Sequence, residues 1–213
     1  MTNLIQPVRE SYAHNSRLYD YMAKQADLKQ IVEFLTWDAE QPAFYVYLRH
    51  WLDKTPAEIR PALQEHIDEE EGEDHSGMFK RMFTGLQELA GNPQVEMDQQ
   101  VLERLNYVFS AQCAQEQNLG FFLGGFLATE FMSQKRCQQL WDGLRRLQAE
   151  FDQEYLALHA EADAHHWIEV DEKLIEPALA KGFASIDTIQ VGINHRLQSS
   201  ANFLKYYETK HLF

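Results

Sequence analysis

Residues 159–166 read His-Ala-Glu-Ala-Asp-Ala-His-His and contain three metal-ligand side chains at helical spacing. A helix turns by about 100° per residue, so Asp163 lies about 40° to one side of His159, and His166 lies about 20° to the other side. The neighbouring positions on this face are mostly apolar, as at Leu156. The face therefore points into the protein, where carboxylates and imidazoles need a hydrogen bond, an ion pair or a metal.

Helical spacing of apolar residues continues outward from this segment over most of the chain. The 213 residues include only 10 glycines and 6 prolines, and no stretch alternates polar and apolar residues as a strand would. There is no internal repeat or biased linker. We therefore predict an all-α protein, a single domain over residues 1–213 folded as a bundle of seven to eight helices. The expected helices cover residues 7–24, 27–37, 40–53, 55–89, 96–114, 117–147 and 149–180, and a last helix begins near residue 185.

Local signals predict where two of these helices begin and end. Residues 55–58, Thr-Pro-Ala-Glu, have the pattern of a capping box with proline at the first helical position. The helix that they open is expected to run to about Leu89, where Gly-Asn-Pro at 91–93 ends it. Gly182 is expected to cap the helix that carries the 159–166 face.

The composition excludes several classes of function. The chain has 19 basic and 33 acidic residues and a net charge of −14, which argues against a nucleic-acid partner. No signal-peptide pattern is present, and the longest apolar run, residues 119–132, is too short to cross a bilayer and contains Glu130. Cys113 and Cys137 form neither a zinc cluster nor a disulfide framework. We expect a soluble cytoplasmic protein with no membrane partner.

Two other helices carry single ionisable side chains on apolar faces. Glu130 interrupts the apolar face of the helix over 117–147, and His75 begins an apolar stripe on the helix over 55–89. A buried glutamate is costly unless it is ligated, paired or protonated, so a neutral or salt-bridged structural Glu130 stays open. A lone core histidine is commonly structural. The convergence of these residues with the 159–166 face makes metal binding the better hypothesis.

Four consecutive acids, residues 68–71, precede His75. On a continuous helix Glu71 lies about 40° from His75 and therefore on its face. The two middle acids share that face only if Gly72 introduces a bulge. We favour Glu71 as the acid beside His75. The alternatives that stay open are Asp68, Glu69 and Glu70.

The predicted ligand set combines three carboxylates and three imidazoles from three helices: Glu71, His75, Glu130, His159, Asp163 and His166. A mixed oxygen and nitrogen shell without thiolate suits iron or manganese better than structural zinc. Six ligands are enough for two metals with open coordination positions. Helical bundles hold dimetal carboxylate centres on their inward faces in this way.

The order of these ligands resembles the signature of the haem-oxygenase-like diiron oxidases and oxygenases, relatives of the thiaminase-like fold. That signature has a glutamate and a histidine on one helix, a glutamate on a second, and His-x-x-x-Asp-x-x-His on a third. The resemblance covers residues 10–207. It implies a haem-oxygenase-like fold, two irons, and O₂-dependent oxidation of a small organic substrate such as an amino acid, an amine or a fatty-acid-like carboxylate. Related folds often dimerise, so a homodimer stays open.

Arg196, in the last expected helix, is the candidate for substrate binding because a guanidinium can bind a carboxylate bidentately. The alternative for Arg196 is an ion pair at the surface or between helices.

Three other functions stay open. A haem oxygenase would use His14 as a proximal ligand and the glycine-rich segment 120–125 beside a porphyrin. A cofactor-free thiaminase-like enzyme would need Cys113 or Cys137 as its nucleophile. A non-enzymatic metal-binding helical protein would hold a closed, coordinatively saturated site.

Overall fold

The computed structural model describes residues 4–15, 17–39, 44–72, 74–96, 98–104, 107 and 118–211, and of residues 14, 15, 161–164 and 211 only the backbone. All regular structure within these residues is helical, which confirms the all-α prediction. The elements are α1 (Ile5–Asn15), α2 (Arg17–Lys24), α3 (Leu28–Ala39), α4 (Phe44–Leu52), α5 (Arg60–Gly72), α6 (His75–Leu89), α8 (Leu119–Arg146), α9 (Glu154–Glu169), the π-helical turn η1 (Val170–Ile175), α10 (Glu176–Ala180) and α11 (Ile186–His211). Residues 99–104 are also helical, and the rest of the helix predicted over 96–114 lies largely outside the described residues.

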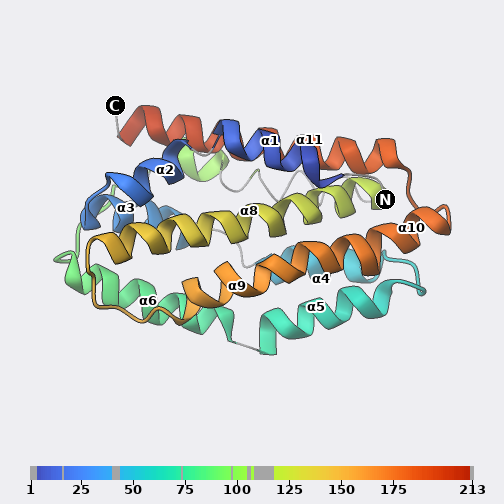
Figure 1. Ribbon diagram of the computed structural model, residues 1–213, viewed down its shortest axis with the longest axis horizontal. Helices are drawn as coiled ribbons and strands as arrows, with labels where there is room; N and C mark the ends of the chain where they lie inside the picture. Colours follow the sequence, from blue (N-terminus) through green and yellow to red (C-terminus); the bar gives the residue numbers. More distant parts are fainter. Residues whose placement is uncertain are drawn as a thin grey trace.

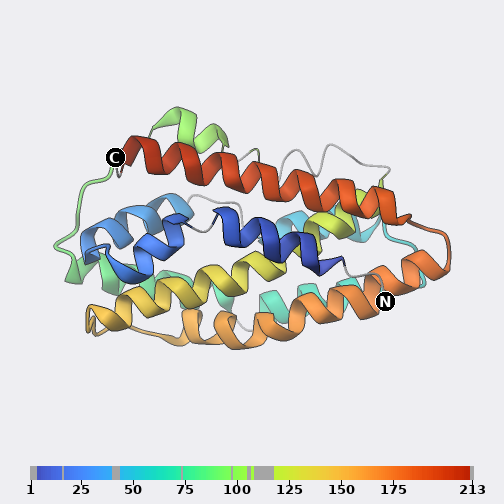
Figure 2. The same ribbon diagram turned by 45° about the horizontal axis from the view of Figure 1, so that its top comes forward.

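Helix α8 runs along the long axis of the molecule, with α11 packed along one side and α9 along the other (Figures 1 and 2). Residues 119–131 of α8 are all buried, as expected for a helix that is apolar on every side. Two apolar cores flank its length, one around Trp51 and Phe122 and the other around Trp37 and Leu140. Helices α5 and α6 lie along the edge of the bundle beyond α9 (Figure 1).

Small residues bring α8 and α11 into close contact. A Cβ atom on Gly124 would lie 2.0 Å from the carbonyl oxygen of Ile189, and one on Gly192 would lie 2.1 Å from that of Phe121. Side chains at these two positions would therefore push the helices apart. Because the backbones touch, side chains about one turn beyond these glycines can also meet, as Thr129 of α8 and Arg196 of α11 do.

The predicted capping box at 55–58 is wrong. The hydroxyl of Thr55 donates to the carbonyl oxygen of Trp51 at 2.9 Å, so Thr55 closes the end of α4 and does not open the next helix. Pro56 begins a turn in which its carbonyl accepts from Arg60 N at 2.9 Å, and α5 starts at Arg60.

The helix predicted to continue to Leu89 is divided in two. Helix α5 ends at Gly72 and α6 begins at His75, with Asp74 between them in the left-handed region at φ 55°. A residue in this region breaks the helical hydrogen-bond ladder. The predicted end of α6 is confirmed, since Gly91 follows it at φ 77°.

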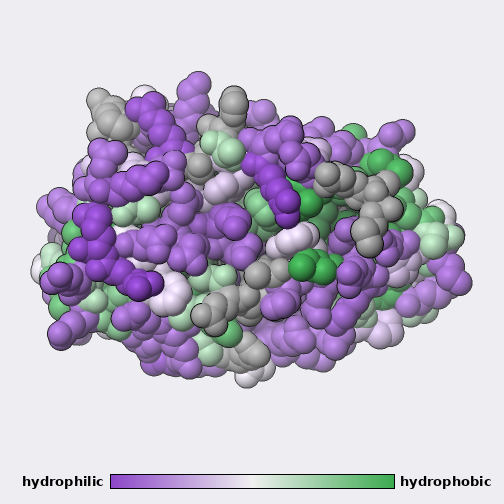
Figure 3. All heavy atoms as spheres, in the orientation of Figure 1, coloured by the Kyte–Doolittle hydropathy of each residue, from purple (hydrophilic) through white to green (hydrophobic). Residues whose placement is uncertain are grey.

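Helix α9, η1 and α10 form one continuous rod from Glu154 to Ala180, close to the predicted span of 149–180. Gly182, at φ 72°, ends the rod as predicted, and the next residue, Phe183, donates its N–H to the carbonyl of Ala178 at 2.9 Å. Hydrophilic residues cover most of the face seen in Figure 3. Among the described helices, none combines the length and hydrophobicity that crossing a membrane requires.

Candidate metal centre

Four helices direct ionisable side chains into the interior between the two apolar cores. Four of these side chains are almost completely buried: His66 on α5, His75 on α6, Glu130 on α8 and His159 on α9. Two more, Glu70 on α5 and His166 on α9, keep only 10% and 12% of their side-chain surface exposed. So many buried polar groups need one another or a bound ion as partners.

Glu70, His75 and His159 form the first group of possible ligands. The Nδ1 atom of His75 lies 2.8 Å from Oε2 of Glu70, and the rings of His75 and His159 are 4.7 Å apart between centroids. Ligand atoms of all three residues lie within 4.8 Å of one another. The Nδ1 of His159 is 2.7 Å from the carbonyl oxygen of Tyr155, and a hydrogen bond there fixes the ring with Nε2 as its ligand nitrogen.

His66, Glu130 and His166 form the second group. Oε1 of Glu130 lies 3.3 Å from Nε2 of His66, and its other oxygen lies 3.6 Å from Nδ1 of His166. The two imidazole rings are 4.8 Å apart between centroids. The buried Nε2 of His66 makes no hydrogen bond to any described residue, so this lone pair or proton faces the space shared with Glu130.

Glu70 joins the two groups. Its Oε2 faces His75 in the first group, while its Oε1 lies 3.9 Å from Nε2 of His66 in the second. His66, Glu70 and Glu130 themselves have ligand atoms within 4.8 Å of one another. The two groups are therefore adjoining parts of one centre.

Charges at the centre keep Glu130 in the form that binds metals. Burial alone raises the pKa of a carboxyl group, but the neighbouring His66 and His166 outweigh burial and lower the pKa of Glu130 to about 2. In return, although burial opposes it, the charge of Glu130 raises the pKa of His66. Glu130 is thus a carboxylate at neutral pH. This excludes the alternative, left open by the sequence, that Glu130 is a neutral structural residue.

The donor set fits iron. It consists of imidazole nitrogens and carboxylate oxygens, with no thiolate among the described residues of the centre, and this chemistry suits iron and manganese. The imidazole nitrogen of His66 that lacks a hydrogen bond is a further sign, because a bound cation would satisfy it.

Four of the six predicted ligands come together in the structure: His75, Glu130, His159 and His166. The backbone of Asp163 belongs to α9, but its side chain lies outside the described residues. Glu71 is placed elsewhere, in a surface ion pair with Arg49, whose Nε lies 2.6 Å from Oε1 of Glu71. Glu70 takes the position beside His75. The physical reason is the break after Gly72, because helical angles cannot be carried across it.

Sequence reasoning missed His66, and it favoured Glu71 over Glu70, which it had kept open as an alternative. A signal for His66 was present, because Leu63 and Ile67 are buried and His66 shares their face of α5. Glu70 is one turn further along the same face. The error was to treat the acids only in relation to His75.

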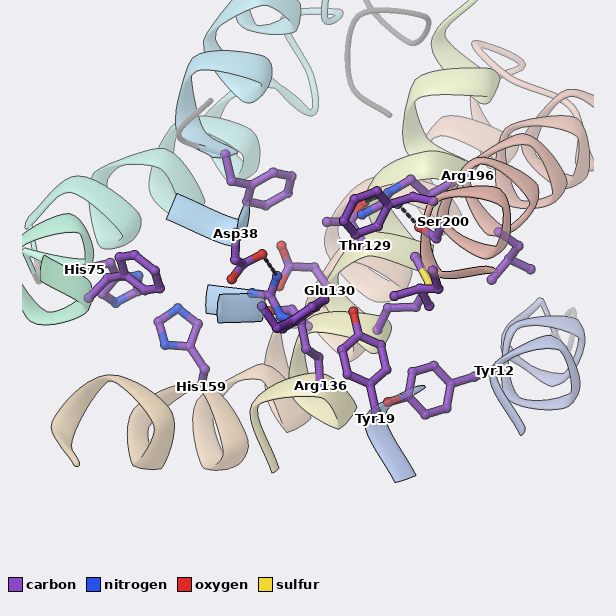
Figure 4. Close-up of a pocket in the computed structure, with 18 of the residues that line it drawn as sticks. Tyr12, Tyr19, Asp38, His75, Thr129, Glu130, Arg136, His159, Arg196 and Ser200 are labelled. Atoms are coloured by element: carbon purple, nitrogen blue, oxygen red, sulfur yellow. Dashed lines mark hydrogen bonds and ion pairs between the residues drawn. The ribbon is translucent and has the colours of Figure 1, made fainter. Parts of the chain in front are cut away.

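A cavity of about 370 Å³ opens beside the first group. Figure 4 shows the rings of His75 and His159 at one end, Arg196 with Thr129 and Ser200 at the other, and Glu130 between them. Aromatic and apolar side chains supply much of the remaining lining: Tyr12, Tyr19, Phe34, Phe44, Phe79, Met132, Tyr155, Leu197, Phe203 and Leu204.

Arg196, the predicted substrate residue, lines this cavity and is 9% exposed. Its Nε donates to the hydroxyl of Thr129 at 2.9 Å, and its Nη1 donates to Ser200. Burial lowers the pKa of Arg196 to about 10, which leaves the guanidinium charged at neutral pH. A second cation in the wall, Arg136, forms an ion pair with Asp38 at 2.9 Å.

Two phenols, Tyr12 and Tyr19, also line the cavity (Figure 4). Burial raises the pKa of Tyr12 and of Tyr19, so both remain protonated hydroxyl groups. The two rings stack with centroids 6.3 Å apart. They add hydrogen-bonding capacity to the cavity without adding negative charge.

Comparison with known protein families matches residues 41–201 to the family described as "Iron-containing redox enzyme". This span includes both ligand groups and Arg196. A search of curated proteins finds no match.

Proposed function

Because the chain belongs to this family of iron-containing redox enzymes, we propose that it is a non-haem diiron enzyme that uses O₂ to oxidise a small organic carboxylate. Iron-dependent redox chemistry and the haem-oxygenase-like fold follow from the family. The second iron, the use of O₂ and the carboxylate substrate are the proposal.

The composition of the two ligand groups carries the proposal. Each group has two imidazoles and one carboxylate: Glu70 with His75 and His159, and Glu130 with His66 and His166. Glu70 also faces the second group, so carboxylates lie both within and between the groups. This repetition supports two metal positions better than one. Two ferrous ions supply electrons that O₂ needs for its activation.

The cavity supports an organic substrate next to the first group. Its volume of about 370 Å³ is within the range of small-molecule sites. Glu70, His75 and His159 form part of its wall, so a bound molecule lies directly beside these ligands. The aromatic lining keeps bulk water from the reacting atoms.

Arg196 supports a carboxylate as the anchoring group of that substrate. Its guanidinium is charged and buried, and bonds to Thr129 and Ser200 hold it in place. The hydroxyl of Thr129 itself donates to the carbonyl of Gly125 at 2.8 Å, which leaves its oxygen to accept from Arg196. A carboxylate bound there directs the rest of the molecule toward His75 and His159, at the opposite end of the cavity (Figure 4).

The other functions considered from the sequence have less support. Gly120 and Gly124, which a porphyrin would need to approach, pack against Thr188 and Ile189 of α11. Cys137 is completely buried and is absent from the described lining of the cavity, and Cys113 lies outside the described residues. A purely structural metal site needs no adjoining cavity.

Loading with ferrous iron under nitrogen, followed by a pulse of O₂, tests the proposed function. We expect two irons per chain and a transient visible absorption after the pulse. The double substitution His159→Ala and His166→Ala removes one ligand from each group, so both the iron and the transient should be lost while far-ultraviolet circular dichroism stays helical. A double variant that still binds two irons and reacts would refute the assignment.

A further inference from the structure

His166 connects the interior of the centre with the surface of the protein. Its Nδ1 lies 3.6 Å from Glu130, whose side chain is 3% exposed. Its Nε2 lies 3.9 Å from Oε2 of Glu69, whose side chain is 41% exposed. One imidazole thus has a buried carboxylate on one side and a solvent-accessible carboxylate on the other.

Glu69, His66 and His166 form a third group whose ligand atoms all lie within 4.8 Å of one another. This group shares its two imidazoles with the second group and adds an exposed acid. His66 is 95% buried, since only 5% of its surface is exposed, and its Nε2 has no hydrogen bond within the described residues. The group is therefore more than a cluster of surface acids.

A small hollow lies beside His66 and Glu69 of this group. Its volume of about 10 Å³ suits one water molecule or one small ion. On one side it is lined by residues of α5, including His66 and Glu69, and on the other by residues of α9 and η1, including Val170 and Lys173. The large cavity reaches Glu70, His75, Glu130 and His159, but its described lining includes neither His66 nor His166. The two pockets therefore border different residues of the centre.

The charges around the hollow favour a cation. Glu65, Glu69 and Glu169 contribute three carboxylates to its lining, whereas Lys173 contributes one ammonium group. The Nζ atom of Lys173 lies 3.3 Å from Glu65 and 3.0 Å from Glu169, so it neutralises only part of this negative charge. A negative concave surface raises the local concentration of cations and their rate of association.

We infer that Glu69, His66 and His166 form a loading port through which ferrous ion reaches the centre. This inference rests on the proposed two-metal function. Glu69 captures the ion at the surface, and the two imidazoles pass it to Glu130, which both of them already face. Glu69 remains a transient ligand, because its exposed side chain exchanges with solvent. The substrate cavity, whose described lining includes none of these three residues, stays free for the organic molecule.

The rate of metal uptake tests the loading port without any measurement of activity. Cobaltous ion serves as the probe, and its visible absorption is followed by stopped flow after mixing with metal-free protein under nitrogen. We expect Glu69→Gln to slow uptake roughly tenfold, the low end of the electrostatic effect on association rates, and to leave the final number of bound ions unchanged. The control Glu172→Gln removes an equal charge from an exposed residue outside the hollow and should load at the wild-type rate.

A second variant probes the ammonium group of the port. Lys173→Gln makes the lining more negative, so uptake should be faster, and the increase should shrink at high salt. Uptake by Glu69→Gln at the wild-type rate would overturn the inference, as would loss of one bound ion, which would make Glu69 a permanent ligand. Failure of the wild type to bind two ions would count against the proposed function instead, whatever the rates of the variants.

Discussion

Glu70 and Glu71 are adjacent in the chain but have opposite surroundings. Glu70 lies at the junction of the two ligand groups, 2.8 Å from His75, whereas Glu71 binds Arg49 at the surface. A carboxylate that touches both groups lowers the free energy of bound cations. One in a surface ion pair contributes little to stability or binding.

We therefore predict different results for the same substitution at the two positions. Glu70→Gln should weaken binding of ferrous iron at least tenfold, since changes even at groups that only support ligands cost that much. Glu71→Gln should bind iron as the wild type does. Anaerobic titration with ferrous iron measures both affinities, and equal affinities for the two variants would show that Glu70 is not a ligand.

Arg196 is a further residue that we expect to serve substrate binding and not the stability of the fold. Burial lowers its pKa to about 10, which means that the protein interior disfavours its charge relative to water. Arg196→Met removes this cost along with the bonds to Thr129 and Ser200, so we expect a melting temperature no lower than that of the wild type.

The same variant should lose its response to carboxylates. Aliphatic and aromatic carboxylates that raise the melting temperature of the wild type should not raise that of Arg196→Met. The control Arg145→Met, which removes an exposed cation stacked on Trp141, should keep the response. A carboxylate-dependent shift that survives in Arg196→Met would contradict the proposed anchoring role.

At the scale of elements, the contact between α8 and α11 positions Thr129 beside Arg196. Gly124 permits this contact because the carbonyl of Ile189 occupies the space that a side chain would need. Backbone atoms cannot turn aside as a flexible side chain can. The close approach of the two helices therefore requires that residue 124 has no side chain.

Gly124→Ala should destabilise the protein by about 1–3 kcal/mol or more, the usual cost of overpacking. The matched control is Gly85→Ala on α6, where a Cβ atom would meet nothing within 4 Å. That change should stabilise the protein by about 0.5–1 kcal/mol, because alanine loses less freedom in a helix than glycine. Urea unfolding gives both values, and a Gly124→Ala protein as stable as the wild type would disprove the close contact.

The helices could largely be predicted from the sequence, but several of their ends could not, and the helix expected over 7–24 comprises α1 and α2. Gly91 and Gly182 were predicted correctly because left-handed glycines leave a clear local signal. Thr55 was misassigned because its hydroxyl bonds to the preceding helix, a choice that tertiary packing decides. The break at Asp74 has no glycine or proline at the left-handed position itself, so helical angles were wrongly extended across it.

The break at Asp74 separates the ligands of the centre that could be predicted from the one that could not. His159 and His166 lie on one uninterrupted helix, so their shared face followed from spacing alone. Glu130 was found because it stands alone on an apolar face. The choice between Glu70 and Glu71 depends on how α5 and α6 meet, and periodicity carries no information about that junction.

At the scale of the whole molecule, the charged centre lies where the two apolar cores meet. Helices α5, α6, α8 and α9 each supply candidate ligands, and the large cavity extends from the centre to α11. The fold thus gives the centre a side that faces an organic molecule and a side that faces the surface through Glu69. Under the proposed function, this arrangement places the substrate beside the irons and limits the access of bulk water to them.

The most direct test of this account is anomalous scattering at the iron edge from crystals loaded with ferrous iron under nitrogen. We predict two iron peaks per chain, one between Glu70, His75 and His159 and the other between Glu130, His66 and His166. A single peak, or peaks away from these side chains, would contradict the two-metal centre.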